Sequence, residues 1–167
     1  MMYSKDTIIA KDGSEIVLTF YAHASVGIEW KGIHIYVDPV GERYNVNYAY
    51  EPKANLILVT HQHTDHLDLE AINLLRAQDT VICASVKCDS IDVYDAVEPH
   101  QQFEFNYIPI TCIPAYNTTE DHLKYHPKEN MGIGYILELG GTLLYFAGDT
   151  EDNEDVLSLQ NVDIAFL

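Results

Sequence analysis

The chain has few cysteines, few basic residues and no long apolar run, and each shortage excludes a class of protein. Its three cysteines, Cys83, Cys88 and Cys112, are too few and too irregularly spaced for a disulfide framework. No apolar run approaches the roughly 18 residues that a membrane span needs. The first residues also lack the apolar stretch of a signal peptide. These absences predict a reduced, cytoplasmic protein without a membrane partner.

The shortage of basic residues also restricts the partners. The 167 residues include 26 Asp and Glu against 9 Lys and Arg, a formal net charge of -17. A field of this sign repels phosphate backbones and anionic membrane surfaces, so nucleic acid is not expected as a partner. The hydrophobic fraction of 47%, without a linker or low-complexity tract, predicts one globular domain over residues 1–167. Composition leaves room for an oligomer.

Apolar runs separated by glycine, proline and polar residues predict many strands and two short helices. Strands are expected at residues 16–22, 25–30, 33–37, 56–59, 81–84, 108–114, 132–139, 143–147 and 162–167. One helix is expected from residue 69, capped by Asp68, and another between residues 151 and 159. Residues 41–55 and 115–131 are expected to be loops. Because the order strand, polar loop, helix, strand occurs twice, we expect an α/β sandwich of two similar halves.

The clearest sign of a functional site is the segment of residues 60–66, Thr-His-Gln-His-Thr-Asp-His. They follow a wholly apolar run that predicts a buried strand. Side chains two positions apart at the end of a strand point the same way, so His61 and His63 are expected to converge, with Asp65 and His66 following in the turn. Imidazole and carboxylate groups suit zinc, manganese or iron. The spacing predicts a metal site beyond a strand end, with a His-rich surface turn as the alternative.

This segment resembles the HxHxDH signature of the metallo-β-lactamase superfamily. Residues 36–39, 114–117 and 148–150 resemble that family's first, third and fourth motifs in the expected order. The resemblance covers about residues 19 to 167 and implies a four-layer αβ/βα sandwich. It implies that Asp38 supports the site from outside. It also implies that the metal ligands are His61, His63, Asp65, His66 and Asp149, and that Asp149 bridges two ions. Residues 21–25 and 38–39 look closest to the branch that includes ascorbate-6-phosphate lactonase.

The chain departs from the family pattern at the third motif, where Asn117 stands in place of a histidine. Asparagine is a weak neutral ligand, so one metal site is short of a donor. His126, whose backbone Pro127 stiffens, is a candidate substitute ligand; otherwise it binds an anionic group of the substrate or is an ordinary loop residue. Tyr116 and Asn117 are also candidates for substrate binding. His23 either approaches the site from the first hairpin or is a core histidine.

The family's last ligand, a histidine in a later loop, has no counterpart in this sequence. Residues 162–167 are apolar and predict a core strand that nothing follows. We therefore expect the chain to lack the C-terminal part of the fold. A natural end with a docked final strand is the alternative.

The resemblance implies a metal-dependent hydrolase with one or two zinc ions, or manganese or iron in their place. A bound ion lowers the pKa of its water from 15.7 toward ~7, and Asp65 is the implied catalytic residue that orients the hydroxide and takes part in proton transfer. The expected substrate is a small polar ester, lactone or phosphoester. Two alternatives remain, a metal-binding scaffold of the same fold without turnover and a phosphodiesterase acting on a small molecule.

Overall fold

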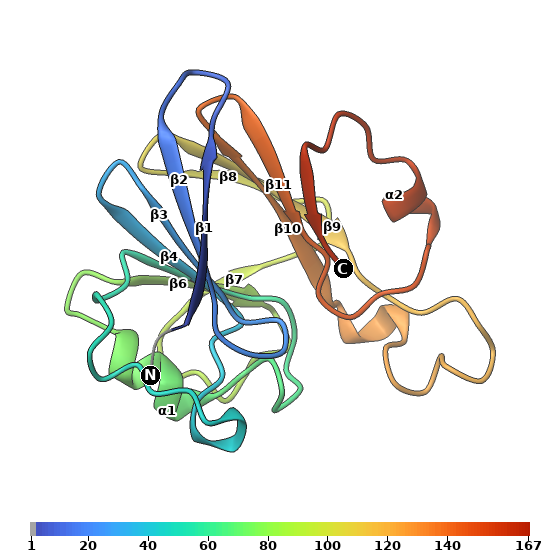
Figure 1. Cartoon of the computed structure of the whole chain (residues 1–167). Coiled ribbons are helices and arrows are strands. Elements are labelled where there is room, and N and C mark those ends of the chain that lie inside the picture. Colours follow the sequence, from blue (N-terminus) through green and yellow to red (C-terminus); the bar gives the residue numbers. More distant parts are fainter. Residues whose placement is uncertain (1–2) are drawn as a thin grey trace.

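In the computed structural model, which describes residues 3–167, two β-sheets pack face to face (Figure 1). Residues 1 and 2, the start of the expected domain, lie outside the described residues. The seven-stranded sheet contains, in spatial order, β1 (Ser4–Ile9), β2 (Glu15–Phe20), β3 (Val26–Trp30), β4 (Ile33–Val37), β5 (Leu56–Val59), β6 (Val81–Ser85) and β7 (Asp95–Val97). The five-stranded sheet contains, in spatial order, β12 (Ile164–Phe166), β11 (Thr142–Phe146), β10 (Ile133–Leu139), β9 (Ile108–Pro114) and β8 (Gln102–Phe105).

The facing sides of the two sheets enclose the main core. Successive side chains of a strand point to opposite faces, and β5 illustrates this alternation. Leu56 and Leu58 of β5 lie in the core between the sheets, whereas Ile57 and Val59 point to the outer side. All four are fully buried, which confirms the predicted strand with both faces covered.

A short helix covers the outer face of each sheet. Helix α1 (Leu69–Leu75) packs Ile72 and Leu75 against the first sheet, and the Asp68 carboxylate accepts hydrogen bonds from two backbone N–H groups of its first turn, as predicted. Helix α2 (Glu154–Leu157) lies beyond the second sheet (Figure 1). The layers are therefore α, β, β and α, which confirms the predicted sandwich. Within residues 3–167, no helix is both long and apolar enough to cross a membrane.

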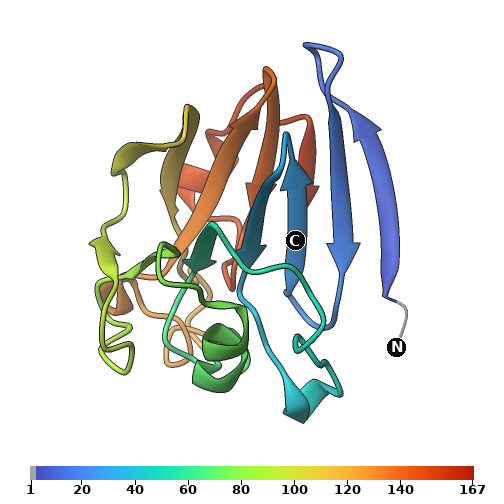
Figure 2. The same cartoon turned by 90° about the vertical axis from the view of Figure 1, so that its left-hand side faces the viewer.

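The parallel part of the first sheet brings several loops to one edge. Strands β4, β5 and β6 are parallel, so their carboxyl ends meet there, and the β2–β3 turn lies beside the end of β4. Figure 2 shows the connections that follow β4 and β5 at this end, together with α1. This edge carries the functional side chains.

The structure differs from the expected elements mainly at weakly apolar segments. Strand β1 was not expected, because its residues are almost all exposed and it lies at the edge of the sheet. Strands β7 and β8 are short and half-exposed, and they were not expected either. Two 3-10 turns, Glu42–Tyr44 and Lys128–Asn130, interrupt the expected loops. The second helix covers only four residues of the expected stretch.

Candidate metal centre

Donor atoms from both sheets converge in two neighbouring groups at this edge. Within each group the ligand atoms lie within 4.8 Å of one another. The first group contains His61, His63, His126 and Asp149, and the second contains His23, Asp65 and His66. Asp149 lies between them, with Oδ2 3.2 Å from His126 Nε2 and Oδ1 3.1 Å from His66 Nε2. One carboxylate therefore presents an oxygen to each group.

His61 carries a buried nitrogen that no protein group satisfies. Among the described residues its Nε2 has no hydrogen-bond partner, and the nearest carboxylate oxygen, on Asp149, is 3.9 Å away. The Thr60 hydroxyl donates its proton to Asp38, so it accepts from His61 Nδ1–H at 3.0 Å. The lone pair of His61 therefore lies on Nε2. Burial, reinforced by the charge of His66, lowers the pKa of His61 to about 3, so the ring is neutral at pH 7.

Asp38 orients two of the histidines from behind. Its carboxylate, 1% exposed, accepts from the Thr60 backbone N–H and hydroxyl at 2.8 and 2.7 Å and from His66 Nδ1–H at 2.7 Å. Burial alone would lower the pKa of His66, but its hydrogen bonds to Asp149 and Asp38 raise it to about 10. The His66 contact in turn holds the pKa of Asp149 well below its usual range. The carboxylates of Asp38 and Asp149 thus lie on either side of a positive charge on His66.

A long loop carries His126 into the first group. The His126 ring lies 4.7 Å from that of His63 and 5.1 Å from that of His61, centroid to centroid. Asn117 lies outside both groups, and it closes the loop instead. Its backbone N–H donates to the His126 carbonyl at 2.8 Å, and its side-chain amide donates to the His122 carbonyl at 3.1 Å. The structure therefore places His126, and not Asn117, beside the other donors.

The remaining sequence candidates occupy different positions. Tyr116 lies outside both donor groups, and its ring faces Lys128 Nζ, 4.7 Å from the centroid. Asp65 belongs to the second group, where its Oδ2 is 3.6 Å from His23 Nε2. The His23 side chain is 37% exposed and faces the site, so the core-histidine alternative is wrong. Glu151, at the start of the expected second helix, binds the long loop.

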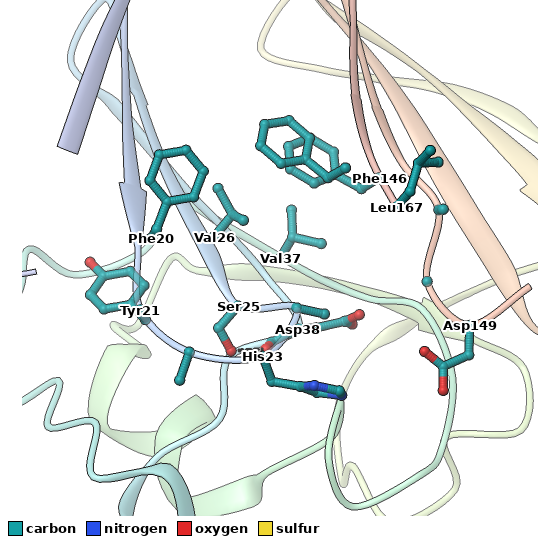
Figure 3. Close-up of a pocket in the computed structure, with 15 residues that line it drawn as sticks. Phe20, Tyr21, His23, Ser25, Val26, Val37, Asp38, Phe146, Asp149 and Leu167 are labelled. Carbon is teal, nitrogen blue, oxygen red and sulfur yellow. Dashed lines mark hydrogen bonds between the residues drawn. The ribbon is translucent and has the colours of Figure 1, made fainter. Parts of the chain in front are cut away.

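A cavity of about 350 Å³ opens beside the second group, between the two sheets (Figure 3). Phe20, Val26 and Phe146 form part of its apolar wall. Figure 3 shows His23 and Asp149 facing each other at one end of this cavity. The residue before Asp149 is Gly148, at φ +62°, and a Cβ there would lie 2.9 Å from the Thr60 side chain. Glycine thus allows the two ligand-bearing segments to approach each other.

A four-layer sandwich with a histidine and aspartate centre at its strand ends defines a metal-binding protein of the metallo-β-lactamase fold. The family profile described as beta-lactamase superfamily domain matches residues 17–167. The chain therefore belongs to the metallo-β-lactamase superfamily, as the sequence motifs predict.

Similar proteins agree with this membership. A crystal structure of a putative metal-dependent hydrolase from Parabacteroides distasonis is 37% identical, covers 99% of this chain and 74% of its own, and superimposes with a TM-score of 0.93. A UPF0173 metal-dependent hydrolase from Bacillus pumilus is 26% identical over 162 residues, which are 89% of this chain and 71% of the relative. The diiron β-hydroxylase CmlA from Streptomyces venezuelae, 18% identical over 90% of this chain and 34% of its own, has a TM-score of 0.68 and shares the fold alone.

Proposed function

We propose that this protein is a metal-dependent hydrolase whose first ion binds His61, His63, His126 and Asp149. The observation that carries the proposal is the buried, neutral His61 Nε2, which has a free lone pair and no protein partner among the described residues. An unsatisfied buried nitrogen is unfavourable, and a cation surrounded by these donors satisfies it. Superfamily membership and the names of the relatives support the same assignment.

Zinc is the proposed ion, with manganese or iron as alternatives. Three imidazoles and one carboxylate form a donor set that suits zinc. When bound, such an ion acts as a Lewis acid and lowers the pKa of a coordinated water from 15.7 toward ~7. Asp38 orients the His66 ring through its hydrogen bond to Nδ1, from outside the proposed set of ligands.

Asp65 is the proposed proton acceptor and donor during hydrolysis. Its side chain is 36% exposed, so water and substrate can reach the carboxylate. Asp65 and His66 belong to the second donor group, and His66 contacts Asp149 of the first group, which supports this role. In that position the Asp65 carboxylate can orient the attacking water and pass a proton to the leaving group.

The proposed substrate is a small polar ester or lactone, with a phosphoester as the second class. The resemblance of residues 21–25 and 38–39 to the ascorbate-6-phosphate lactonase branch supports the lactone. The net charge of -17 opposes nucleic acid. The cavity volume of about 350 Å³ lies in the range of small-molecule sites. The three buried, unpaired cysteines support the predicted cytoplasmic location.

Metal binding is tested with the full chain, stripped of metal and titrated with Zn²⁺. His126→Ala should weaken the first ion more than ~100-fold, because loss of an outer partner alone costs about 10–100-fold. The control is His34→Ala, which lies outside both donor groups. If His126 binds the substrate instead of the metal, His126→Ala raises KM at full metal occupancy. If neither quantity changes, His126 has neither role.

Turnover is tested on the same preparation with a panel of lactone, phosphodiester and thioester substrates. Hydrolysis should appear on addition of Zn²⁺ and disappear with a chelator. Bound metal without turnover on any member of the panel would contradict the hydrolase proposal and favour a metal-binding scaffold.

A further inference from the structure

His23 lies far from the histidine motif in sequence but beside it in space. Its Nε2 is 3.2 Å from His66 Nε2 and 3.6 Å from Asp65 Oδ2. We propose that His23, at the β2–β3 turn, is a ligand of a second metal ion that it shares with Asp65, His66 and Asp149. This inference rests on the proposed function, since it concerns the neighbouring ion of the same centre.

The hydrogen bonds around His66 explain why a cation fits this position. His66 Nδ1 donates to the Asp38 carboxylate, which can only accept, so Nε2 is the ring nitrogen that faces the site and that a cation would bind in place of its proton. That nitrogen faces His23 Nε2 and, at 3.1 Å, Asp149 Oδ1. His66 Nε2 therefore has a nitrogen and a carboxylate oxygen as close neighbours. Two nitrogens bound at ~2.0–2.1 Å to a tetrahedral ion lie about 3.3 Å apart. The observed distance of 3.2 Å between the Nε2 atoms of His23 and His66 agrees with this value.

The turn holds the His23 ring ready for this role. The backbone of His23 has φ +52°, and its ring contacts His66. Ser25 fixes the turn, because its hydroxyl donates to the Asp38 carbonyl and accepts from the Val40 N–H at 2.9 Å. The His23 ring stacks on Tyr44 with 5.5 Å between centroids and 5° between planes. An imidazole held in this way loses little conformational entropy when it binds an ion.

The same contacts connect His23 to the residue that positions His66. Asp38 binds the His66 ring through its carboxylate and the Ser25 hydroxyl through its backbone carbonyl. Asp38 therefore contacts both the His66 ring and the turn that carries His23. This link is what an ordinary surface histidine lacks, and it is why we assign His23 to the ion instead of to a simple hydrogen bond with His66.

The test measures how many Zn²⁺ ions the full chain binds and how tightly it binds each one. The wild-type protein, stripped of metal, should bind two equivalents of Zn²⁺ in a titration against a chromophoric chelator. His23→Gly, chosen because glycine adopts the positive φ without strain, should keep the first ion and weaken the second at least tenfold. His23→Asn, which also tolerates this backbone, removes the imidazole without the added flexibility of glycine. His34→Gly, also a histidine outside both donor groups, is the control.

Cobalt substitution supplies a second readout. The visible absorption of Co²⁺ at the second site should change when His23 is replaced, because the spectrum follows the number and type of ligands. A second ion bound as tightly by both His23 variants as by wild type would overturn the inference, and so would a wild-type protein that binds one ion. Neither result removes the first ion, whereas a wild-type protein that binds no ion contradicts the proposed function as well.

Discussion

At the scale of single residues, Asp38 has the widest influence on the site. Its carboxylate orients His66 directly and His61 through Thr60, and its carbonyl anchors Ser25. The motif around Asp38 could be read from the sequence, and so could the segment that contains His61 and His66. For His23 the sequence left two positions open, because the outcome depends on a positive φ in a turn and on contacts with residues that follow it by tens of positions.

The influence of Asp38 gives a prediction for Asp38→Asn. Asparagine keeps the shape and tolerates φ +43°, but it loses the charge and one of the acceptors. We expect Zn²⁺ affinity to fall about 10–100-fold, the usual effect of removing a partner that orients a ligand. The measurement is the chelator titration, with the exposed Asp79→Asn as control. Unaltered affinity in Asp38→Asn would mean that the ligands do not depend on this carboxylate.

At the scale of elements, the long loop could be predicted from the sequence, but the position of its histidine could not. Residues 115–131 were correctly expected to be a loop, and His126 was the histidine singled out there as a substitute ligand. The position of His126 depends on Glu151, which lies 29 to 33 positions from its partners in the loop. Its Oε2 accepts from the Thr118 and Thr119 N–H groups at 2.7 and 2.6 Å, and its Oε1 contacts His122 Nδ1. Such long-range contacts leave no local pattern in the sequence.

Glu151→Gln tests this anchor. The amide keeps one acceptor but loses the charge that binds the loop, so we expect the first ion to bind about 10-fold more weakly while the second is unchanged. The hydrogen bond from His122, followed by those from Thr119 and Thr118, lowers the pKa of Glu151 from 4.5 to about 2. A lowered pKa in the folded state means that this carboxylate stabilises the protein fully above about pH 4.5 and loses the effect as pH falls through 2.

The pH dependence is measured by urea unfolding of the metal-free protein between pH 2 and pH 6. The wild type should lose more stability than Glu151→Gln over this interval, because only the wild type carries the titrating group. Glu120→Gln, an exposed residue of the same loop, should follow the wild-type profile. Parallel profiles for wild type and Glu151→Gln would show that the carboxylate does not anchor the loop.

At the scale of the whole molecule, the metal centre depends on how the two sheets meet. The first sheet and its loops supply His23, His61 and their neighbours, whereas Asp149 and His126 follow strands of the second sheet. The repeated order of elements predicts two packed halves, and this prediction is confirmed. The relative placement of the sheets was not predictable, since it is set by side chains that cross the core between residues far apart in the chain.

Tyr135 on β10 is one such side chain, and its loss should destabilise the packing of the sheets. Its buried hydroxyl donates to the Val59 carbonyl at 2.9 Å, with the Cys83 carbonyl at 3.3 Å, so it joins the second sheet to two strands of the first. Tyr135→Phe keeps the ring and removes this bond. We expect the free energy of unfolding to fall by about 1–2 kcal/mol, because a buried carbonyl loses its donor.

Urea unfolding of the metal-free protein measures this change, as a lower midpoint at unchanged m value. Tyr50→Phe is the matched control, because that side chain is 94% exposed and its replacement should change stability by less than about 0.5 kcal/mol. The Val59 carbonyl directly precedes the segment that carries His61. The metal affinity of Tyr135→Phe therefore also shows whether the metal centre depends on the placement of the two sheets. A loss of stability with normal affinity would mean that the centre tolerates small shifts between the sheets. Equal unfolding midpoints for Tyr135→Phe and Tyr50→Phe would show that this hydrogen bond does not hold the two sheets together.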